Sequence, residues 1–308
     1  MLGRHADHAW VVGHAPGDAG PAPAPTRIGG RLFTWGSRTF VMGIVNVTPD
    51  SFSGDGLLAG DPAVARNRVV GAAVALARRM VEEGADLLDV GGESSRPGHA
   101  VVDAAEELRR VVPVVAAIHA ALPDTPISVD TTKPSVAAAA IDAGAALLND
   151  VWGVAPDGAL SRLAAARDVP IVLMHNRAEA RYDDLIGEVL AELAEAVHRA
   201  RAAGVPEASI IVDPGFGFGK APAHNLALLA GLDRLRSLGQ PILLGTSRKS
   251  TLGKVLDLPP DERLEATLAT TALAVRAGVD IVRVHDVRPN VRVARLVDAV
   301  VRGWTGPA

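Results

Sequence analysis

Short apolar segments alternate with longer amphipathic segments along most of this 308-residue chain. The apolar segments have the length of buried strands, and the segments between them have the 3.6-residue periodicity of helices. The pattern predicts eight strands, at Val41–Val45, Leu87–Val90, Ile127–Val129, Ala146–Leu148, Ile171–Met174, Ile210–Val212, Ile242–Leu244 and Ile281–Val284. The helices predicted between them include Val64–Glu83, Ala104–Ala121, Asp183–Ala203 and Arg263–Ala277.

This alternation indicates an α/β protein whose parallel sheet is covered by helices on both faces. Eight strand–helix units in about 270 residues are typical of a closed (β/α)8 TIM barrel. A doubly wound open sheet is the alternative, but the first unit lacks the G-x-G-x-x-G sequence of dinucleotide-binding folds. Before the first strand, Arg31–Trp35 and Arg38–Val41 flank Gly36-Ser37, and this arrangement predicts a short hairpin.

Composition and charge fit one domain of this kind. Residues 1–27 contain Pro21-Ala-Pro-Ala-Pro25 and no apolar signal-peptide core, so we expect a disordered Pro/Ala-rich leader before a single (β/α)8 domain at 28–308. Hydrophobic residues make up 48% of the chain and can fill a large core. A net charge of −4 without a long basic run argues against nucleic acid or an anionic membrane as a partner. With no cysteine and no long apolar run, we expect a cytoplasmic protein without disulfides.

Polar or ionisable residues follow every predicted strand. They are Asn46; Asp89 and Glu93; Asp130; Asn149 and Asp150; His175 and Asn176; Asp213; Ser247, Arg248 and Lys249; and Arg283, His285 and Asp286. Barrel active sites assemble at the carboxyl ends of the strands, so this distribution indicates an enzyme. Helix caps are the structural alternative, and could account for Asp130, Asp150 and Asp286. They account less well for the glycine-flanked loops at 46–56 and 91–98, which resemble mobile lids.

The most unusual stretch is Ile210-Ile-Val-Asp-Pro-Gly-Phe-Gly-Phe-Gly-Lys220. It places a carboxylate at a strand end, then a glycine loop, then a lysine, and its spacing is not that of a Walker A loop. Phe216 and Phe218 have no evident core to fill, and a simple strand–helix connection is the structural alternative. The chain has only four lysines, of which Lys133, Lys220 and Lys249 lie just beyond predicted strands, either by chance or because an ammonium is required there.

Converging Asp, Asn and Lys side chains suit a flat heterocycle with several N–H and C=O groups. Arg96, Arg283 and His285 are candidate anion-binding groups beside them. The spacing of a closed zinc site is missing from the sequence, whereas magnesium held mainly by substrate phosphates is compatible with it. The residues alone therefore indicate a barrel enzyme that acts on an amino-heterocycle carrying an anionic or phosphorylated group.

Seven motifs, in order, resemble the dihydropteroate synthase family of pterin-binding TIM barrels. They are Gly43-Ile-Val-Asn-Val-Thr-Pro-Asp-Ser-Phe52, Asp89-Val-Gly-Gly-Glu-Ser-Ser-Arg-Pro-Gly98, Ser128-Val-Asp-Thr131, Leu148-Asn-Asp150, Asp213-Pro-Gly-Phe-Gly-Phe-Gly-Lys220, Ser247-Arg-Lys-Ser250 and Arg283-Val-His285. The resemblance implies a transferase of folate biosynthesis that joins (7,8-dihydropterin-6-yl)methyl diphosphate to p-aminobenzoate, giving 7,8-dihydropteroate and diphosphate. It also implies an SN1-like reaction with Mg2+-assisted loss of diphosphate.

The resemblance further implies a role for each matching residue. The pterin would contact Ser95, Asp130, Asn149, Met174, Asp213, Lys249 and Arg283, and the aminobenzoate would contact Arg96, Pro97, Phe218 and Ser250. The diphosphate would be bound by Asn46, Arg283 and His285, with Asn46 also a ligand of the magnesium ion. The catalytic residues would be Asp130, Lys249, Arg283 and His285.

Several expectations accompany this resemblance. The family implies a homodimer formed by the last helices, around 263–277 and 291–302, and a target of sulfonamides, which resemble aminobenzoate. One departure is the first loop, Ser51-Phe-Ser-Gly-Asp-Gly56, whose acidic residue lies one position later than usual, so Asp55 receives no role. A pterin-binding methyltransferase barrel, a pterin binder without turnover and a purely structural barrel are the alternatives.

Overall fold

The structure is a computed structural model, and it describes residues 22–47, 62–93 and 102–304. Within these residues, eight parallel strands form one sheet. The strands are β3 (Phe40–Asn46), β4 (Leu87–Gly91), β5 (Ile127–Asp130), β6 (Leu147–Asp150), β7 (Ile171–Met174), β8 (Ile210–Asp213), β9 (Leu243–Leu244) and β10 (Ile281–Val284).

The order of neighbours in this sheet is β8-β7-β6-β5-β4-β3-β10-β9. Consecutive strands are neighbours throughout, without the reversal that a doubly wound sheet requires. The two ends of the sheet meet where Val212 forms a bridge with Ile242 and its N–H donates to the Pro241 carbonyl at 2.9 Å. The sheet is therefore a nearly closed barrel, which confirms the predicted fold.

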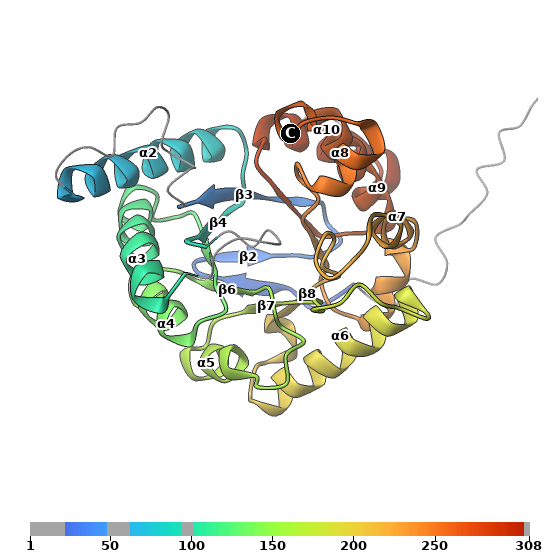
Figure 1. The fold of residues 1–308 in the computed structure, drawn as a ribbon, viewed down its shortest axis with the longest axis horizontal. Coiled ribbons are helices and arrows are strands. Elements are labelled where there is room, and N and C mark those ends of the chain that lie inside the picture. The colour runs from blue at the N-terminus through green and yellow to red at the C-terminus, as the bar shows by residue number, and fades with distance from the viewer. Residues whose placement is uncertain (1–21, 48–61, 94–101, 305–308) are drawn as a thin grey trace, which may run out of the picture.

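Helices surround the strands in chain order, from α2 in blue to α10 in red (Figure 1). They are α2 (Pro62–Glu82), α3 (Ala104–Ala121), α4 (Pro134–Asp142), α5 (Ala159–Arg167), α6 (Leu185–Ala202), α7 (Pro222–Ala230), α8 (Ser250–Leu256), α9 (Leu264–Ala277) and α10 (Val287–Arg302). Short 3-10 segments lie at Glu207–Ser209, Leu232–Leu238 and Pro260–Glu262. Of the helices in the described ranges, none has the length and apolar character needed to cross a membrane.

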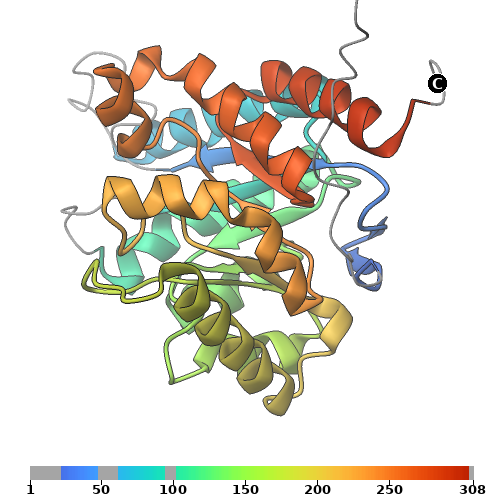
Figure 2. The same ribbon diagram turned by 90° about the vertical axis from the view of Figure 1, so that its right-hand side faces the viewer.

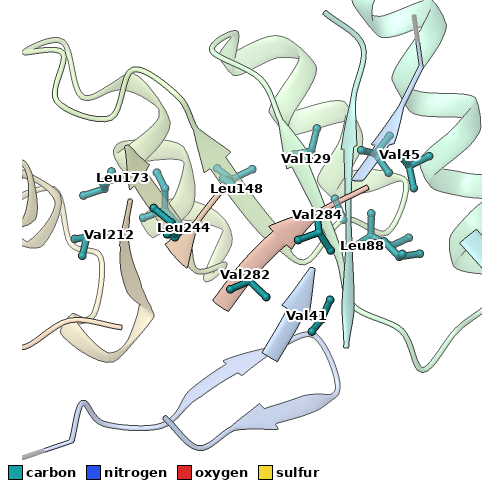
Figure 3. Packing of buried hydrophobic residues seen from close by; sticks show 14 of the residues in the cluster. Val41, Val45, Leu88, Val129, Leu148, Leu173, Val212, Leu244, Val282 and Val284 are labelled. Atoms are coloured by element: carbon teal, nitrogen blue, oxygen red, sulfur yellow. The ribbon is translucent and has the colours of Figure 1, made fainter. Parts of the chain in front are cut away.

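Alternation along the strands divides the core into two clusters, because successive side chains point to opposite faces. One cluster lies between the strands and the helices, and its residues on the strands include Val41, Leu88, Val129 and Val212 (Figure 3). The second cluster contains the intervening residues, which face the barrel interior: Met42, Leu87, Leu147, Val172, Ile211, Leu243 and Ile281. This second set fills the end of the barrel where the strands begin.

An N-terminal hairpin closes that end of the barrel, but it is not the hairpin predicted from the sequence. Strand β1 (Thr26–Ile28) pairs with β2 (Arg31–Phe33) through the turn Gly29-Gly30, and β1 begins two residues before the expected domain start. The predicted pairing of Arg31–Trp35 with Arg38–Val41 is wrong, because both edges of β3 are already taken by β4 and β10. Ile28 and Phe33 of the hairpin join the interior cluster, and the blue hairpin lies at one end of the molecule (Figure 2).

Candidate active site

The same alternation places a polar layer inside the other end of the barrel. Because side chains alternate along a strand, every second residue faces the barrel interior. The inward-facing residues at the carboxyl ends of the strands are polar, apart from one methionine. They are Asn46, Asp89, Asp130, Asn149, Met174, Asp213 and Arg283. The strand register aligns Asp130 with Asn149 and Met174 with Asp213, so these pairs lie at the same level of the barrel. Active sites of this fold are built at this end.

Arg283 is held between two carboxylates in this layer. Its Nε donates to Asp89 Oδ2 at 2.6 Å, and its Nη2 donates to Asp130 Oδ2 at 3.0 Å. Burial raises the pKa of Asp130 to about 7, although the positive charge of Arg283 opposes that shift. The pKa of Arg283 is itself raised, since Asp89 and Asp130 outweigh the effect of its burial. A flat guanidinium is thus fixed in orientation before any ligand binds.

Asp89 connects this pair to the next strands. It is fully buried, and its Oδ2 also accepts a hydrogen bond from Asn149 Nδ2 at 3.0 Å. Its Oδ1 has no hydrogen-bond partner among the described residues. Asn149 is 4% exposed, so its amide group is held in place by Asp89 rather than by water. The four side chains therefore form one connected polar network.

Lys249 approaches the same space from the loop after β9. Its Nζ donates to the Phe216 carbonyl and lies 4.4 Å from the centre of the Phe218 ring. Burial lowers the pKa of Lys249 to about 7, although the carboxylate of Asp213 favours the charged form. Burial raises the pKa of Asp213 in turn. Both Lys249 and Asp130 are therefore set to titrate near neutral pH.

The glycine-rich loop after β8 is held tightly against the ends of β7 and β8. Asp213 Oδ1 accepts a hydrogen bond from the Gly215 N–H at 2.7 Å, and Gly217 N–H donates to Asn225 Oδ1 at 2.7 Å. A Cβ atom at Gly215 would overlap the His175 carbonyl oxygen. Burial lowers the pKa of Lys220, which ends the loop, to about 7. The expectation that Phe216 has no core to fill is wrong, because its side chain is fully buried in the core between strands and helices.

His285 lies next to Ser247 at the edge of this layer. Its Nδ1 is 2.9 Å from Ser247 Oγ, and its backbone N–H donates to the same oxygen. The neighbouring Asp286 occupies the first position before α10 but makes no side-chain cap bond. It pairs instead with Arg248, whose Nη2 lies 2.6 Å from Asp286 Oδ1. Asp130 is likewise an ion-pair partner rather than a cap, while Asp150 accepts a turn hydrogen bond from Trp152 N–H.

The other predicted contacts divide into two groups. Met174 is buried beside Asp213, and Ser250 is exposed as the first residue of α8. Ser95, Arg96 and Pro97 lie outside the described residues, as do Asp55 and most of the two loops interpreted as lids. The structure therefore brings together most of the residues predicted to contact the pterin. Two of the four residues predicted to contact the aminobenzoate lie outside the described residues.

A protein-only metal site is not formed by the described residues, which contain no group of three or more His, Cys, Asp or Glu side chains suited to one ion. Asn46 ends β3 with its side chain half-buried and without a hydrogen-bond partner among the described residues. An amide oxygen is one of the hard donors that magnesium accepts. This single donor fits an ion whose other ligands come from substrate phosphate and water.

The sequence did not reveal what Asp89 and the pair formed by Lys220 and His175 contact. Asp89 was recognised as a polar strand end but received no role, although it holds both Arg283 and Asn149. Lys220 and His175 form a buried pair, with Nζ and Nδ1 2.9 Å apart. The scarcity of lysine in this chain was a signal for Lys220, whereas the contact with His175 joins residues 45 positions apart and could not be read from local pattern.

Comparisons with known proteins agree with this arrangement. Residues 42–285 match the model of the family described as "Pterin binding enzyme". The dihydropteroate synthase of Clostridium beijerinckii is 47% identical over 277 residues, which are 90% of this chain and 99% of that protein. This chain belongs to the dihydropteroate synthase family. The family's reaction makes its members transferases.

Solved structures of the dihydropteroate synthase family have the same fold. That of the Clostridium difficile enzyme, determined in the presence of pteroic acid, is 47% identical with a TM-score of 0.82, covering 88% of this chain and 99% of that one. The Xanthomonas albilineans enzyme, determined with 4-aminobenzoic acid, is 44% identical with a TM-score of 0.83, covering 91% and 98%. These likenesses extend over nearly the whole described barrel.

Proposed function

We propose that this chain condenses (7,8-dihydropterin-6-yl)methyl diphosphate with p-aminobenzoate, releasing 7,8-dihydropteroate and diphosphate. The observation that carries the proposal is the connected network of Arg283, Asp89, Asp130 and Asn149 at the carboxyl ends of the strands. Such a network offers acceptors, donors and a flat cation to one planar heterocycle. Family membership supplies the identity of that heterocycle.

The pterin lies in the polar layer with its hydrogen-bonding edges on Asp130, Asn149, Asp213 and Lys249. A carboxylate accepts two parallel N–H bonds from an amino-pyrimidinone edge, and an ammonium donates to its carbonyl or ring nitrogen. Arg283 covers one face of the ring, since Asp89 and Asp130 hold its guanidinium flat. Met174 packs against the ring, and Ser95 makes a further contact with this substrate.

The aminobenzoate lies beside the glycine-rich loop. Phe218 contributes a half-buried ring next to Lys249, and Ser250 contributes a hydroxyl near the substrate's carboxylate. Arg96 and Pro97 complete this side of the site. An aromatic acid fits between an aromatic face and polar groups of this kind.

Asn46, Arg283 and His285 bind the diphosphate at the edge of the layer. Mg2+ would be held by Asn46 and the phosphates, and when bound it offsets negative charge on the leaving group. Ser247 fixes the imidazole of His285 through its Nδ1 contact at 2.9 Å. Asp89 and Asp130 fix the guanidinium of Arg283, so both anion-binding side chains are held in place before the diphosphate leaves.

The reaction breaks the C–O bond between the pterin methylene and the diphosphate. The electron-rich dihydropterin stabilises the resulting methylene cation, and the neutral amine of aminobenzoate then forms the new C–N bond and loses a proton. The walls of buried Met174 and half-buried Phe218 limit access of water to the cation. This sequence needs no protein nucleophile.

The test is diphosphate release by purified protein with the pterin diphosphate and Mg2+, with and without p-aminobenzoate. Aminobenzoate-dependent release with formation of dihydropteroate supports the proposal. Pterin binding without turnover would favour a binder, and methyl transfer in place of condensation would favour the methyltransferase alternative. Asp213→Asn should lose turnover, whereas Asp233→Asn, which changes an exposed carboxylate, should retain it.

Two further features belong to this proposal. The chain forms a homodimer through α9 and α10, where Leu273, Leu296 and Val300 expose half or more of their surface. Its location is the cytoplasm. Sulfonamides, one of which is present in a Yersinia pestis relative's structure, compete with aminobenzoate at this site.

A further inference from the structure

Lys220 ends the glycine-rich loop 214–219, and its side chain turns back into that loop. It is 9% exposed, in a chain that otherwise places arginine at most basic positions. The proposed contacts with pterin, aminobenzoate and diphosphate do not include it. A buried ammonium requires acceptors for its protons, and those acceptors indicate what Lys220 does.

The ammonium of Lys220 has three N–H groups and three acceptors around it. Its Nζ donates to the carbonyl oxygens of Gly215 and Phe218, at 3.2 Å each. The third contact is His175 Nδ1 at 2.9 Å. One compact cation therefore joins the first and the fourth residues of a four-residue turn, in which the Phe218 N–H also donates to the Gly215 carbonyl.

His175 provides the fixed end of this contact. Its side chain is fully buried, and burial lowers its pKa to about 4, so the imidazole is neutral at neutral pH. Nδ1 then accepts from Lys220, which leaves the ring proton on Nε2, 3.1 Å from Glu192 Oε2 on α6. Glu192 is paired in turn with Arg177. Lys220 therefore contacts a ring that is held in place by its burial, next to Glu192 of α6.

The two residues whose carbonyls Lys220 holds, Gly215 and Phe218, also contact the side chains of the site. The N–H of Gly215 donates to Asp213 at 2.7 Å, and Phe218 places its ring 4.4 Å from Lys249 Nζ. A shift of the Phe218 backbone would move that ring directly. Asp213 is less dependent on Lys220, because it is the last residue of β8 and its backbone is fixed by pairing with Met174.

We propose that Lys220 is a positioning residue for the aminobenzoate side of the active site. It holds the backbone of Gly215 and Phe218 so that the Phe218 ring faces the bound aminobenzoate; this rests on the proposed function. An ammonium directs three donors from one atom at acceptors around it, whereas the planar donors of an arginine cannot converge in this way.

The experiment compares Lys220→Met with Lys254→Met in the full chain. Met keeps the length of the side chain and removes all three donors, and Lys254 is an exposed lysine on α8. The wild-type protein is first shown to release diphosphate in an aminobenzoate-dependent way, and failure there concerns the proposed function, not Lys220. KM for each substrate, kcat and Tm are then measured for all three proteins.

For Lys220→Met we expect KM for p-aminobenzoate to rise about tenfold, as the loss of charge-assisted hydrogen bonds would give. KM for the pterin diphosphate should stay within about twofold, and Lys254→Met should match the wild type. Partial unfolding lowers the maximal rate but not KM, so a lower Tm with both KM values unchanged would overturn the proposal. An equal rise in both KM values would also overturn it.

A second variant keeps the test decisive if Lys220→Met does not fold. Lys220→Gln retains two N–H donors at a shorter reach, and the same KM values are measured for it. A rise in KM for p-aminobenzoate alone supports the positioning role. Unchanged KM values in folded Lys220→Gln contradict it.

Discussion

At the scale of single residues, Asp89 orients two other side chains of the site, although no substrate contact is proposed for it. Its Oδ2 receives hydrogen bonds from both Arg283 and Asn149, which come from strands on opposite sides of β4 in the sheet. Its side chain is fully buried, so water cannot replace it as an acceptor. Removing its charge would leave a buried guanidinium with one carboxylate partner in place of two.

Asp89→Asn should therefore misplace Arg283 and lower kcat/KM for the pterin diphosphate. A displacement of a positioning group by about 1 Å costs roughly 100-fold in rate, and we expect a loss of that order. The measurement is steady-state kinetics with the pterin concentration varied. Asp142→Asn is the matched control, because Asp142 pairs with Arg167 at the surface, and kcat/KM should not change there. Equal kinetics for Asp89→Asn and the wild type would contradict this prediction.

The pH dependence follows from two side chains with opposite shifts. The pKa of Asp130 is raised to about 7 and that of Lys249 is lowered to about 7. Below this pH Asp130 becomes protonated and loses acceptor capacity, and above it Lys249 loses the proton it donates. We expect kcat/KM for the pterin diphosphate to fall on both sides of neutral pH.

Lys249→Arg separates the two sides of this profile. Arginine stays protonated throughout the accessible range, so the fall at high pH should move upward while the fall at low pH remains. The assay is a pH series of kcat/KM for both proteins. A high-pH fall that stays in place in Lys249→Arg would assign it to another group.

At the scale of elements, the glycine-rich loop depends on close contact as well as on backbone angles. Gly215 has φ +70 and Gly239 has φ +69, so an alanine is unfavourable at both. Gly239 has nothing within 4 Å of an added Cβ, whereas a Cβ at Gly215 would overlap the His175 carbonyl. Comparing alanine variants at Gly215 and Gly239 therefore separates the cost of the positive backbone angle from the cost of overlap with a neighbouring atom.

Gly239→Ala should lower the free energy of unfolding by about 1 kcal/mol, the cost of a left-handed residue. Gly215→Ala should lower it by more than about 3 kcal/mol, since the loop must also move away from β7. Chemical denaturation of both variants provides the comparison. Similar values for the two would mean that the loop relaxes easily, and the proposed tight positioning of Phe218 would lose its support.

Elements were predictable from the sequence where their cause is local. The eight strands and the long helices were predicted from short apolar runs and from the helical spacing of apolar residues, both of which lie within a short stretch of sequence. The observed ends of α3 are the predicted ones. The hairpin was misplaced because its pairing depends on which strands occupy the edges of β3, a property of the whole sheet. The buried position of Phe216 and the role of Asp89 depend on residues far away in the chain. Asp130, Asn149, Asp213 and Arg283 were predictable because a polar side chain at a strand end has a local signature.

At the scale of the whole molecule, α9 and α10 lie side by side on the outside of the barrel (Figure 1). Leu296 and Val300 are one helical turn apart on α10 and are 68% and 76% exposed. Apolar side chains grouped in this way are typical of an interface. Leu273 on α9 is also half-exposed.

The double variant Leu296→Glu, Val300→Glu should convert the proposed homodimer to a monomer, because each new carboxylate would be buried at the proposed interface without a partner. Light scattering coupled to size-exclusion chromatography measures the mass. Leu32→Glu is the control, since Leu32 is 57% exposed on the hairpin and its replacement should leave the mass unchanged. A wild-type protein that elutes as a monomer would contradict the homodimer itself.

The barrel closes at one bridge between Val212 and Ile242, while the other neighbouring strands of the described sheet pair through two or more residues. Fewer hydrogen bonds must open there, so the Val212 amide should exchange its hydrogen faster than the amides shared by β4 and β5. Asp213 lies on one side of this junction and Lys249 on the other. A pterin held by both would connect the two sides and slow that exchange, so the substrate would supply the stability that the shortest strand does not.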